Sequence, residues 1–248
     1  MLLIIVRSVM DNNYMNIILL GKAGSGKGTQ AEMIKNEYDL IHISTGDLIR
    51  KEIEENTDLG QKALPYSNEG LLVPDNIIFA ILFKNIRNTL KDLKKEDFKG
   101  IIFDGFPRTI QQAKLLNKAL LRIFKLNINI VMELDLKDEL SIARISNRVK
   151  ESEVARKDDL NIEAIKKRLD IYTRESKKIK DLYSDLPLTT LKVFKADKDK
   201  ETTFNEIKKF LDSKLNSKAP IKNLDRIEQE MLIINSLDEK TYNKLTEE

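Results

Sequence analysis

A glycine-rich segment near the start of the chain has the spacing of a phosphate-binding loop. It reads Gly21-Lys-Ala-Gly-Ser-Gly-Lys27-Gly-Thr29 and fits the pattern Gly-x-x-x-x-Gly-Lys. Glycines let successive backbone N–H groups turn towards an anion, and the N-terminus of a following helix adds partial positive charge. Lys27 adds a full charge for the outer phosphates of a nucleotide. The spacing therefore predicts a protein that binds a nucleotide through its phosphates.

Such a loop needs a strand before it and a helix after it, and the flanking residues predict both. Residues 16–20 form a short apolar run that stops at Gly21, which is typical of a buried strand. Residues 30–38 have apolar positions at helical spacing. The loop therefore lies in the context that phosphate binding requires.

The rest of the chain alternates between short apolar runs and helical patterns. Alternation of this kind predicts an α/β fold in which a five-stranded parallel sheet is flanked by helices. Asp75 and Asn161 are expected to cap two of the helices, and 65–74 and 150–159 to be an irregular segment and a surface loop. The other expected strands are 41–43, 101–104, 127–134 and 188–194, and the other expected helices are 47–56, 111–124, 140–149 and 204–215.

The amino-acid composition limits the class of protein and the partners that it can have. The 248 residues include 41% hydrophobic and 33% charged residues, which suffices for a core, and the net charge is only +3. Such a small charge gives no strong attraction to nucleic acid or membrane, and no stretch approaches the ~18 apolar residues of a membrane span. The absence of cysteine excludes disulfides. We expect a cytoplasmic monomer without a nucleic-acid or membrane partner.

Both ends of the chain are expected to lie outside the main domain. Met15 comes directly before the first strong strand, so residues 1–14 are interpreted as an extension. Pro220 interrupts the alternating pattern, and 216–248 is interpreted as a tail of unassigned role. The domain itself is therefore expected to span 15–215.

Four segments, in order along the chain, resemble the adenylate kinase family. Gly21–Gln30 is similar to the loop Gly-x-x-Gly-x-Gly-Lys-Gly-Thr-Gln of that family, with Ala23 at its usual proline. Ser44–Arg50, Gly70–Asp75 and, most distinctively, Phe103–Thr109 resemble its acceptor-binding segments. The resemblance covers about 15–215. It implies a P-loop kinase fold with a small monophosphate-binding insertion at 44–75 and a short lid at 148–156.

The resemblance implies a donor site for ATP. Arg144 and Arg148 are one helical turn apart and share a face, where they would meet ATP. Lys198 stands where the family usually has glycine, in the segment that packs on the adenine of ATP. Mg²⁺ would enter with ATP, through Thr29 and, by way of water, Asp104. The implied ATP-binding residues are Gly24, Ser25, Gly26, Lys27, Gly28, Thr29, Arg144, Arg148 and Lys198.

The resemblance also implies an acceptor site for AMP. Thr45 would lie near the adenine, Arg50 and Arg108 would bind the phosphate, and Gln112 would read the adenine with an amide that both donates and accepts. Arginine suits phosphate because its planar group donates two parallel hydrogen bonds. The implied AMP-binding residues are Thr45, Arg50, Leu71, Leu72, Val73, Gly105, Phe106, Pro107, Arg108, Gln112, Arg156 and Arg168.

The function implied is reversible phosphoryl transfer from Mg-ATP to AMP, giving two ADP. Its catalytic residues would be Lys27, Asp104, Arg108, Arg148, Arg156 and Arg168. One alternative is a UMP/CMP kinase of the same fold, a group that typically has alanine at the position of Thr45. Another is a weakly active regulatory homologue, which Ala23 and Lys198 favour slightly and the complete arginine set opposes. His42, the only histidine, flanks a strand and is expected to be structural, with no partner that would make it a general base or a metal ligand.

The short lid is predicted to hold no zinc. Residues 149–155 contain no Cys or His, and Glu151 and Glu153 are too few for the closed ligand set of a structural zinc site. Elemental analysis of the purified protein should therefore find no stoichiometric zinc. Zinc at one equivalent per chain, with a lower thermal stability after chelation, would contradict this prediction.

Overall fold

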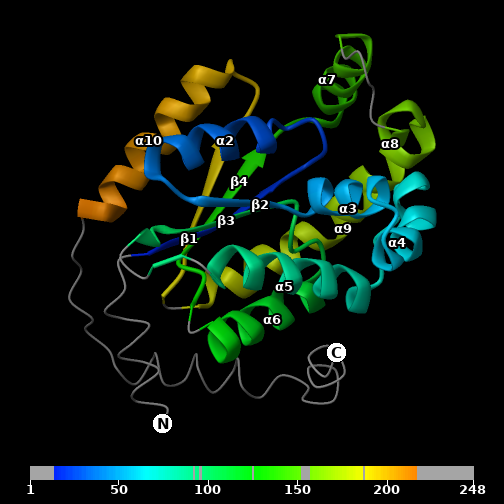
Figure 1. The fold of residues 1–248 in the computed structure, drawn as a ribbon. Helices are drawn as coiled ribbons and strands as arrows, with labels where there is room; N and C mark the ends of the chain where they lie inside the picture. The colour runs from blue at the N-terminus through cyan, green and yellow to red at the C-terminus, as the bar shows by residue number, and fades with distance from the viewer. Residues whose placement is uncertain are drawn as a thin grey trace.

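The computed structural model describes residues 14–91, 93–94, 97–124, 126–151, 157–186 and 188–216. Its five strands form one parallel sheet in the order β2-β3-β1-β4-β5 (Figure 1). The predicted α/β fold with a five-stranded parallel sheet is therefore confirmed. Of the expected extension 1–14 and tail 216–248, all but residues 14 and 216 lie outside the described residues. The strands are β1 Met15–Gly21, β2 Ile41–Ser44, β3 Gly100–Asp104, β4 Ile130–Asp135 and β5 Thr190–Lys195.

Helices cover both faces of this sheet. They are α2 Lys27–Tyr38, α3 Thr45–Glu54, α4 Asp58–Asn68, α5 Asp75–Lys91, α6 Ile110–Ala119, α7 Asp138–Glu151, α8 Lys157–Leu160, α9 Ile162–Ser184 and α10 Lys200–Asn216. None of the described helices combines the length and apolarity needed to cross a membrane. The predicted helix 111–124 keeps its helical course but ends in a π-helical turn, Leu120–Phe124.

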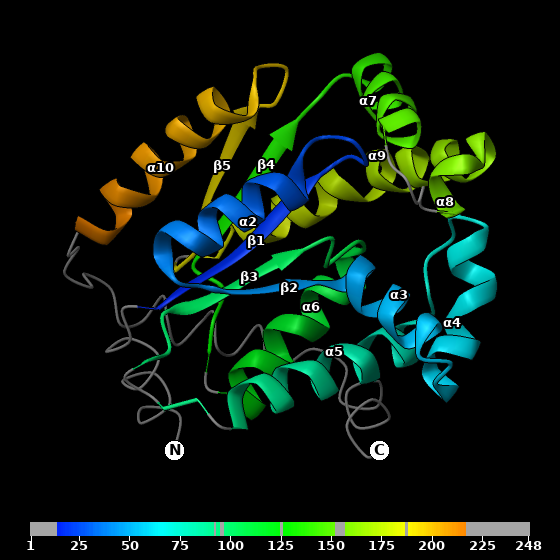
Figure 2. The same ribbon diagram turned by 45° about the horizontal axis from the view of Figure 1, so that its top comes forward.

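The central strand β1 is buried on both sides, and its side chains alternate between two cores. Ile17 and Leu19 pack in one core with Ala31 of α2 and Ile207 of α10. The adjacent β1 side chains pack in the other core, with residues of α5, α6 and α9. Figures 1 and 2 show the corresponding layers, with α2 and α10 on one face and α5, α6 and α9 on the other. The continuous apolar run of β1 is thus explained by burial on both faces.

Parallel pairing brings the carboxyl ends of the strands to one edge of the sheet. Leu19 and Ser44 are both registered with Asp104, which ends β3. The helices α3, α4, α7 and α8 lie beyond this edge (Figure 2). Segments that are far apart in the sequence therefore meet there, which is the usual place for a ligand in an open α/β sheet.

The expectation of an irregular segment over 65–74 is wrong at its start. Pro65 lies inside α4, which continues to Asn68. Proline removes one backbone donor, but Pro65 is exposed, so water can satisfy the carbonyl of Gln61 that loses its partner. The helix then ends within one turn, and 71–74 have no regular structure, as expected.

The region of the expected lid is more helical than predicted. A surface loop was expected over 150–159, but α7 extends to Glu151 and α8 begins at Lys157. Residues 152–156 lie outside the described part of the chain. The predicted cap at Asn161 is confirmed, because its side-chain oxygen accepts hydrogen bonds from the N–H groups of Glu163 and Ala164 at 2.9 and 3.3 Å. The other expected cap, Asp75, is instead the first residue of α5.

Gly60 lets α4 pack directly on the end of α3. A Cβ atom at this position would lie 2.7 Å from the backbone nitrogen of Ile53 and still closer to the carbonyl of Glu52. Gly60→Ala should therefore lower the free energy of unfolding by about 1–3 kcal/mol, the usual effect of overpacking against backbone. Chemical denaturation should measure this loss, with Lys62→Ala on the exposed side of α4 as the control. Equal stability of the two variants would contradict the packing described here.

Candidate nucleotide-binding site

The predicted phosphate loop connects β1 to α2 at the carboxyl edge of the sheet. Gly24 and Gly26 have φ angles of 79° and 89°, a region that glycine adopts without strain. A Cβ atom at Gly24 would lie 2.7 Å from the carbonyl oxygen of Ser141, so the loop also packs tightly on α7. The first turn of α2 contains no acidic residue. The N-terminus of α2 therefore retains the partial positive charge that favours an anion.

Lys27 begins α2 and points back along the loop. Its Nζ donates hydrogen bonds to the carbonyls of Gly21 and Lys22 at 2.8 and 2.9 Å. Burial is the main cause that lowers the pKa of Lys27, from 10.5 to about 8. Asp104 opposes this shift, and neighbouring arginines add to it. Lys27 is thus a cation held among other cations.

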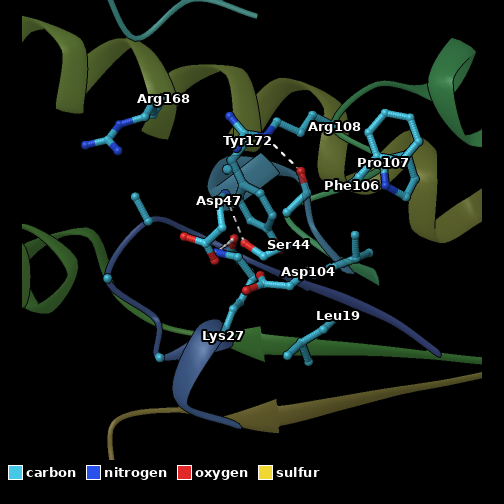
Figure 3. Close-up of a pocket in the computed structure, with 18 of the residues that line it drawn as sticks. Leu19, Lys27, Ser44, Asp47, Asp104, Phe106, Pro107, Arg108, Arg168 and Tyr172 are labelled. Atoms are coloured by element: carbon cyan, nitrogen blue, oxygen red, sulfur yellow. Dashed lines mark hydrogen bonds between the residues drawn. The ribbon is translucent and has the colours of Figure 1, made fainter. Parts of the chain in front are cut away.

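Asp104 lies beside Lys27 at the end of β3 (Figure 3). His42 lies between two carboxylates, since its Nε2 is 3.6 Å from Asp104 and its Nδ1 is 3.5 Å from Glu32. Burial alone would lower the pKa of His42, but these two carboxylates raise it above its ordinary value. The registration of Ser44 with Asp104 places His42 near this carboxylate, and a sequence without a known strand order could not reveal this.

A cavity of about 640 Å³ joins the phosphate loop to the acceptor segments. Its walls include Arg108 and Arg168, both of which lie above Lys27 in the view of Figure 3. Most of the predicted donor residues therefore face the same space as several predicted acceptor residues. The predicted residues that line it are Gly24, Gly26, Lys27, Gly28, Thr29, Arg50, Leu72, Asp104, Gly105, Phe106, Pro107, Arg108, Arg148 and Arg168.

Buried Asp159 holds two of the arginines. Arg168 donates a hydrogen bond to its carboxylate at 2.8 Å, and Arg148 binds the other oxygen. Only 1% of the Asp159 side chain is exposed. Burial raises the pKa of Asp159, but the two guanidinium groups hold it below its ordinary value. This carboxylate therefore fixes two cations from α7 and α9 at one end of the cavity.

A smaller recess adjoins the cavity and is lined in part by residues of α3, α4, α5 and α6. Arg50, Arg108 and Arg168 line both spaces. The amide of Gln112 is already bonded, to Asp75 and to the backbone of Arg108. The predicted AMP-binding residues in this recess are Thr45, Arg50, Leu71, Leu72, Val73, Gly105, Phe106, Arg108, Gln112 and Arg168.

Three of the predicted residues that the structure describes are not on the walls of either space. Ser25 is buried within the loop. Arg144 donates a hydrogen bond to the carbonyl of Lys198 at 3.4 Å, so these two residues lie together but apart from the phosphate region. The Lys198 side chain pairs with Glu206, and Lys198 does not share the positive φ seen at Asp39 and Asn56 among the described non-glycine residues. Glycine is therefore not required there. Arg156 lies outside the described residues.

Besides the predicted Arg168, α9 adds Ile171, Tyr172, Ser176 and Ile179 to the cavity wall, and these four were not predicted from the sequence. Tyr172 lies one helical turn after Arg168 and donates a hydrogen bond to Glu133 at 2.5 Å. Burial and this carboxylate raise the pKa of Tyr172. Glu133 also pairs with Lys180, so the three side chains fasten α9 to β4. The four-residue spacing from Arg168 predicts a shared face, but not that this face meets the cavity.

A phosphate loop that shares a cation-lined cavity with a second recess is suited to two phosphorylated ligands. This arrangement defines the class of P-loop kinases that phosphorylate small molecules. Residues 19–187 match the adenylate kinase family. The chain therefore belongs to the adenylate kinase family and is a nucleoside monophosphate kinase.

Several similar proteins carry the name adenylate kinase. One from Porphyromonas gingivalis is 44% identical over 170 residues, which cover 68% of this chain and 82% of that protein. One from Bacteroides fragilis is 43% identical over 169 residues, covering 68% and 84%. One from Methanosarcina mazei is 36% identical over 220 residues, covering 79% and 98%. These relatives favour adenylate kinase over the two alternatives raised from the sequence.

The lowered pKa of Lys27 predicts the pH dependence of ATP use. Above its pKa of about 8, free Lys27 loses the proton that carries its charge, so kcat/KM for ATP should fall as pH rises through this value. Bound phosphate should raise the same pKa, because an opposite charge favours the protonated amine. The kcat profile should then begin to fall at a higher pH than the kcat/KM profile. A kcat/KM profile that stays level through about pH 9 would contradict the assignment of Lys27.

Proposed function

We propose that the chain transfers the terminal phosphoryl group of ATP to AMP in this cavity, giving two ADP. The observation that carries the proposal is the convergence of Lys27, Arg50, Arg108, Arg148 and Arg168 on one space beside the phosphate loop. A phosphate oxygen of AMP attacks the γ-phosphorus of ATP, and the bond to the bridging oxygen of ADP breaks. The attacking oxygen is already ionised at neutral pH, so the reaction needs no general base.

The donor side is proposed to hold ATP by its phosphates and its base. Backbone N–H groups of Gly24, Ser25, Gly26, Gly28 and Thr29 cradle the phosphates, as their loop geometry supports. Lys27 and Arg148 neutralise charge that develops on the transferring group, and such preorganised charges are usually a large catalytic contribution. The linked pair Arg144 and Lys198 is proposed to meet the adenine of ATP, which its position beyond the loop supports.

The acceptor side is proposed to hold AMP between two sets of contacts. Arg50, Arg108 and Arg168, with Arg156 as predicted from the sequence, bind the transferring and acceptor phosphates. Apolar and small residues of the recess surround the base, and Gln112 reads its edge. The supporting observation is that one recess is lined both by arginines and by apolar side chains. The members of this second set are Thr45, Leu71, Leu72, Val73, Gly105, Phe106, Pro107 and Gln112.

Mg²⁺ is proposed to enter with ATP rather than to occupy a permanent protein site. Thr29 and Asp104 line the cavity beside Lys27 and offer the oxygen ligands that this ion prefers. They would hold it, Asp104 by way of water, and the bound ion would neutralise phosphate charge. Among the residues that the structure describes, three or more His, Cys, Asp or Glu side chains do not converge on a metal site.

Exclusion of water is proposed to depend on two segments beyond the sheet edge. Hydrolysis of ATP would compete with transfer if water reached the γ-phosphate, so closure must follow binding. The proposed segments are the monophosphate-binding region 44–75 and the short lid 148–156 of the domain 15–215. The protein is further proposed to act as a cytoplasmic monomer, without a nucleic-acid or membrane partner. The small net charge supports the proposed lack of a nucleic-acid or membrane partner.

A coupled assay with ATP and each of AMP, UMP and CMP tests the proposed function. AMP should give the highest kcat/KM, because the polar Thr45 and Gln112 suit an adenine edge. Lys27→Met should lower kcat at least about 100-fold in a folded protein, since it removes a charge aimed at the transferring phosphate.

The matched control is Lys35→Met, a partly exposed lysine near the end of the same helix, which should keep its activity. A higher kcat/KM for UMP or CMP would reject AMP as the acceptor. Near-normal turnover by Lys27→Met would reject the proposed role of the phosphate loop.

A further inference from the structure

The amide of Gln112 is held at both ends by groups of fixed hydrogen-bonding character. Its Nε2 donates to Oδ1 of Asp75 at 2.9 Å, and its Oε1 accepts from the backbone N–H of Arg108 at 2.8 Å. Gln112 is only 2% exposed. Asp75 belongs to the first turn of α5, and Arg108 lies in the loop after β3. Two separate elements therefore hold this one side chain at the wall of the acceptor recess.

These partners allow only one orientation of the amide. An ionised carboxylate only accepts hydrogen bonds, and a backbone N–H only donates them. A flipped Gln112 would place its oxygen against the Asp75 carboxylate and its NH₂ group against the Arg108 N–H. Both contacts would then be repulsive, and two partly buried polar groups would lose their partners. Asp75 and Arg108 therefore impose the same orientation.

A fixed orientation has a consequence for the base that Gln112 can read. An amide has two N–H groups and two lone pairs on its oxygen, so one donor and one acceptor remain after these contacts. The adenine edge presents an amino donor at position 6 and an acceptor at N1. Hypoxanthine presents the opposite pattern, with an oxygen at position 6 and an N1–H donor. A freely flipping amide could pair with either base, whereas a fixed amide pairs with one.

We propose that Asp75 is a specificity-determining residue that locks Gln112 in the orientation that selects 6-amino over 6-oxo purines. The proposal rests on the proposed function, because it requires the acceptor base to lie in the recess. Asp75 acts through Gln112 and is a positioning residue. A purely structural role, in which its charge stabilises the N-terminus of α5, would affect all acceptors alike.

The test compares AMP with IMP as acceptors, since these differ only on the edge that Gln112 would read. The kcat/KM of each is measured with ATP for the wild type, Asp75→Asn and Asp75→Ala. Both variants remove the charged acceptor, so the preference for AMP should fall about tenfold, the size expected when one charge-assisted hydrogen bond no longer opposes the flip. Glu201→Gln, an exposed acidic residue in the first turn of α10, is the matched control and should keep the wild-type ratio.

The possible results distinguish a specificity role of Asp75 from a structural one. A parallel loss of kcat/KM for AMP and IMP, with an unchanged ratio, would overturn the proposal and leave Asp75 a structural role. Equal use of AMP and IMP by the wild type would overturn it without any variant. Failure of the wild type to phosphorylate AMP would instead reject the proposed function. Thermal denaturation shows which variants are folded, and Asp75→Asn preserves the shape of the side chain if Asp75→Ala does not fold.

Discussion

The cations around the cavity repel one another, and the rest of the site has to offset this repulsion. Lys27 shows its effect, because burial and neighbouring arginines lower its pKa to about 8. The protein holds these cations with fixed acceptors: backbone carbonyls for Lys27, Asp159 for Arg148 and Arg168, and Asp47 for Arg50. Phosphate groups would relieve the repulsion that remains. The same preorganised charges that bind phosphate are then in place for its transfer.

The parallel sheet makes this concentration of charge possible. Its two apolar cores stabilise β1 from both faces, and the phosphate loop and Asp104 follow at the edge where the strands end. The helix α9 then crosses beside this edge and brings Arg168 opposite Lys27 (Figure 3). Its attachment to β4 through Tyr172, Glu133 and Lys180 fixes the helix that carries this arginine. Core packing and catalytic geometry therefore depend on the same strands.

Features set by local sequence were predictable, and features set by strand order were not. The apolar run before Gly21, the loop spacing and the cap at Asn161 depend on neighbouring residues, and the structure contains all three. Contacts of His42 with Asp104, and of Tyr172 with Glu133, join residues 62 and 39 positions apart, which no periodicity reveals. An irregular segment was predicted from Pro65 onward, but the residue lies in the last turn of α4, where it is exposed and the helix tolerates it. The role of Arg156 stays a prediction.

We infer that a phosphoryl group is transferred between two phosphates bound in the cavity, and that water is excluded from the reaction. Phosphorus NMR of the protein with Mg²⁺ and ADP as the only nucleotide tests this claim most directly, because the reverse reaction then starts from a single compound. ATP and AMP should appear in equal amounts until equilibrium, without a signal from inorganic phosphate. Release of inorganic phosphate, or AMP formed without matching ATP, would contradict this claim.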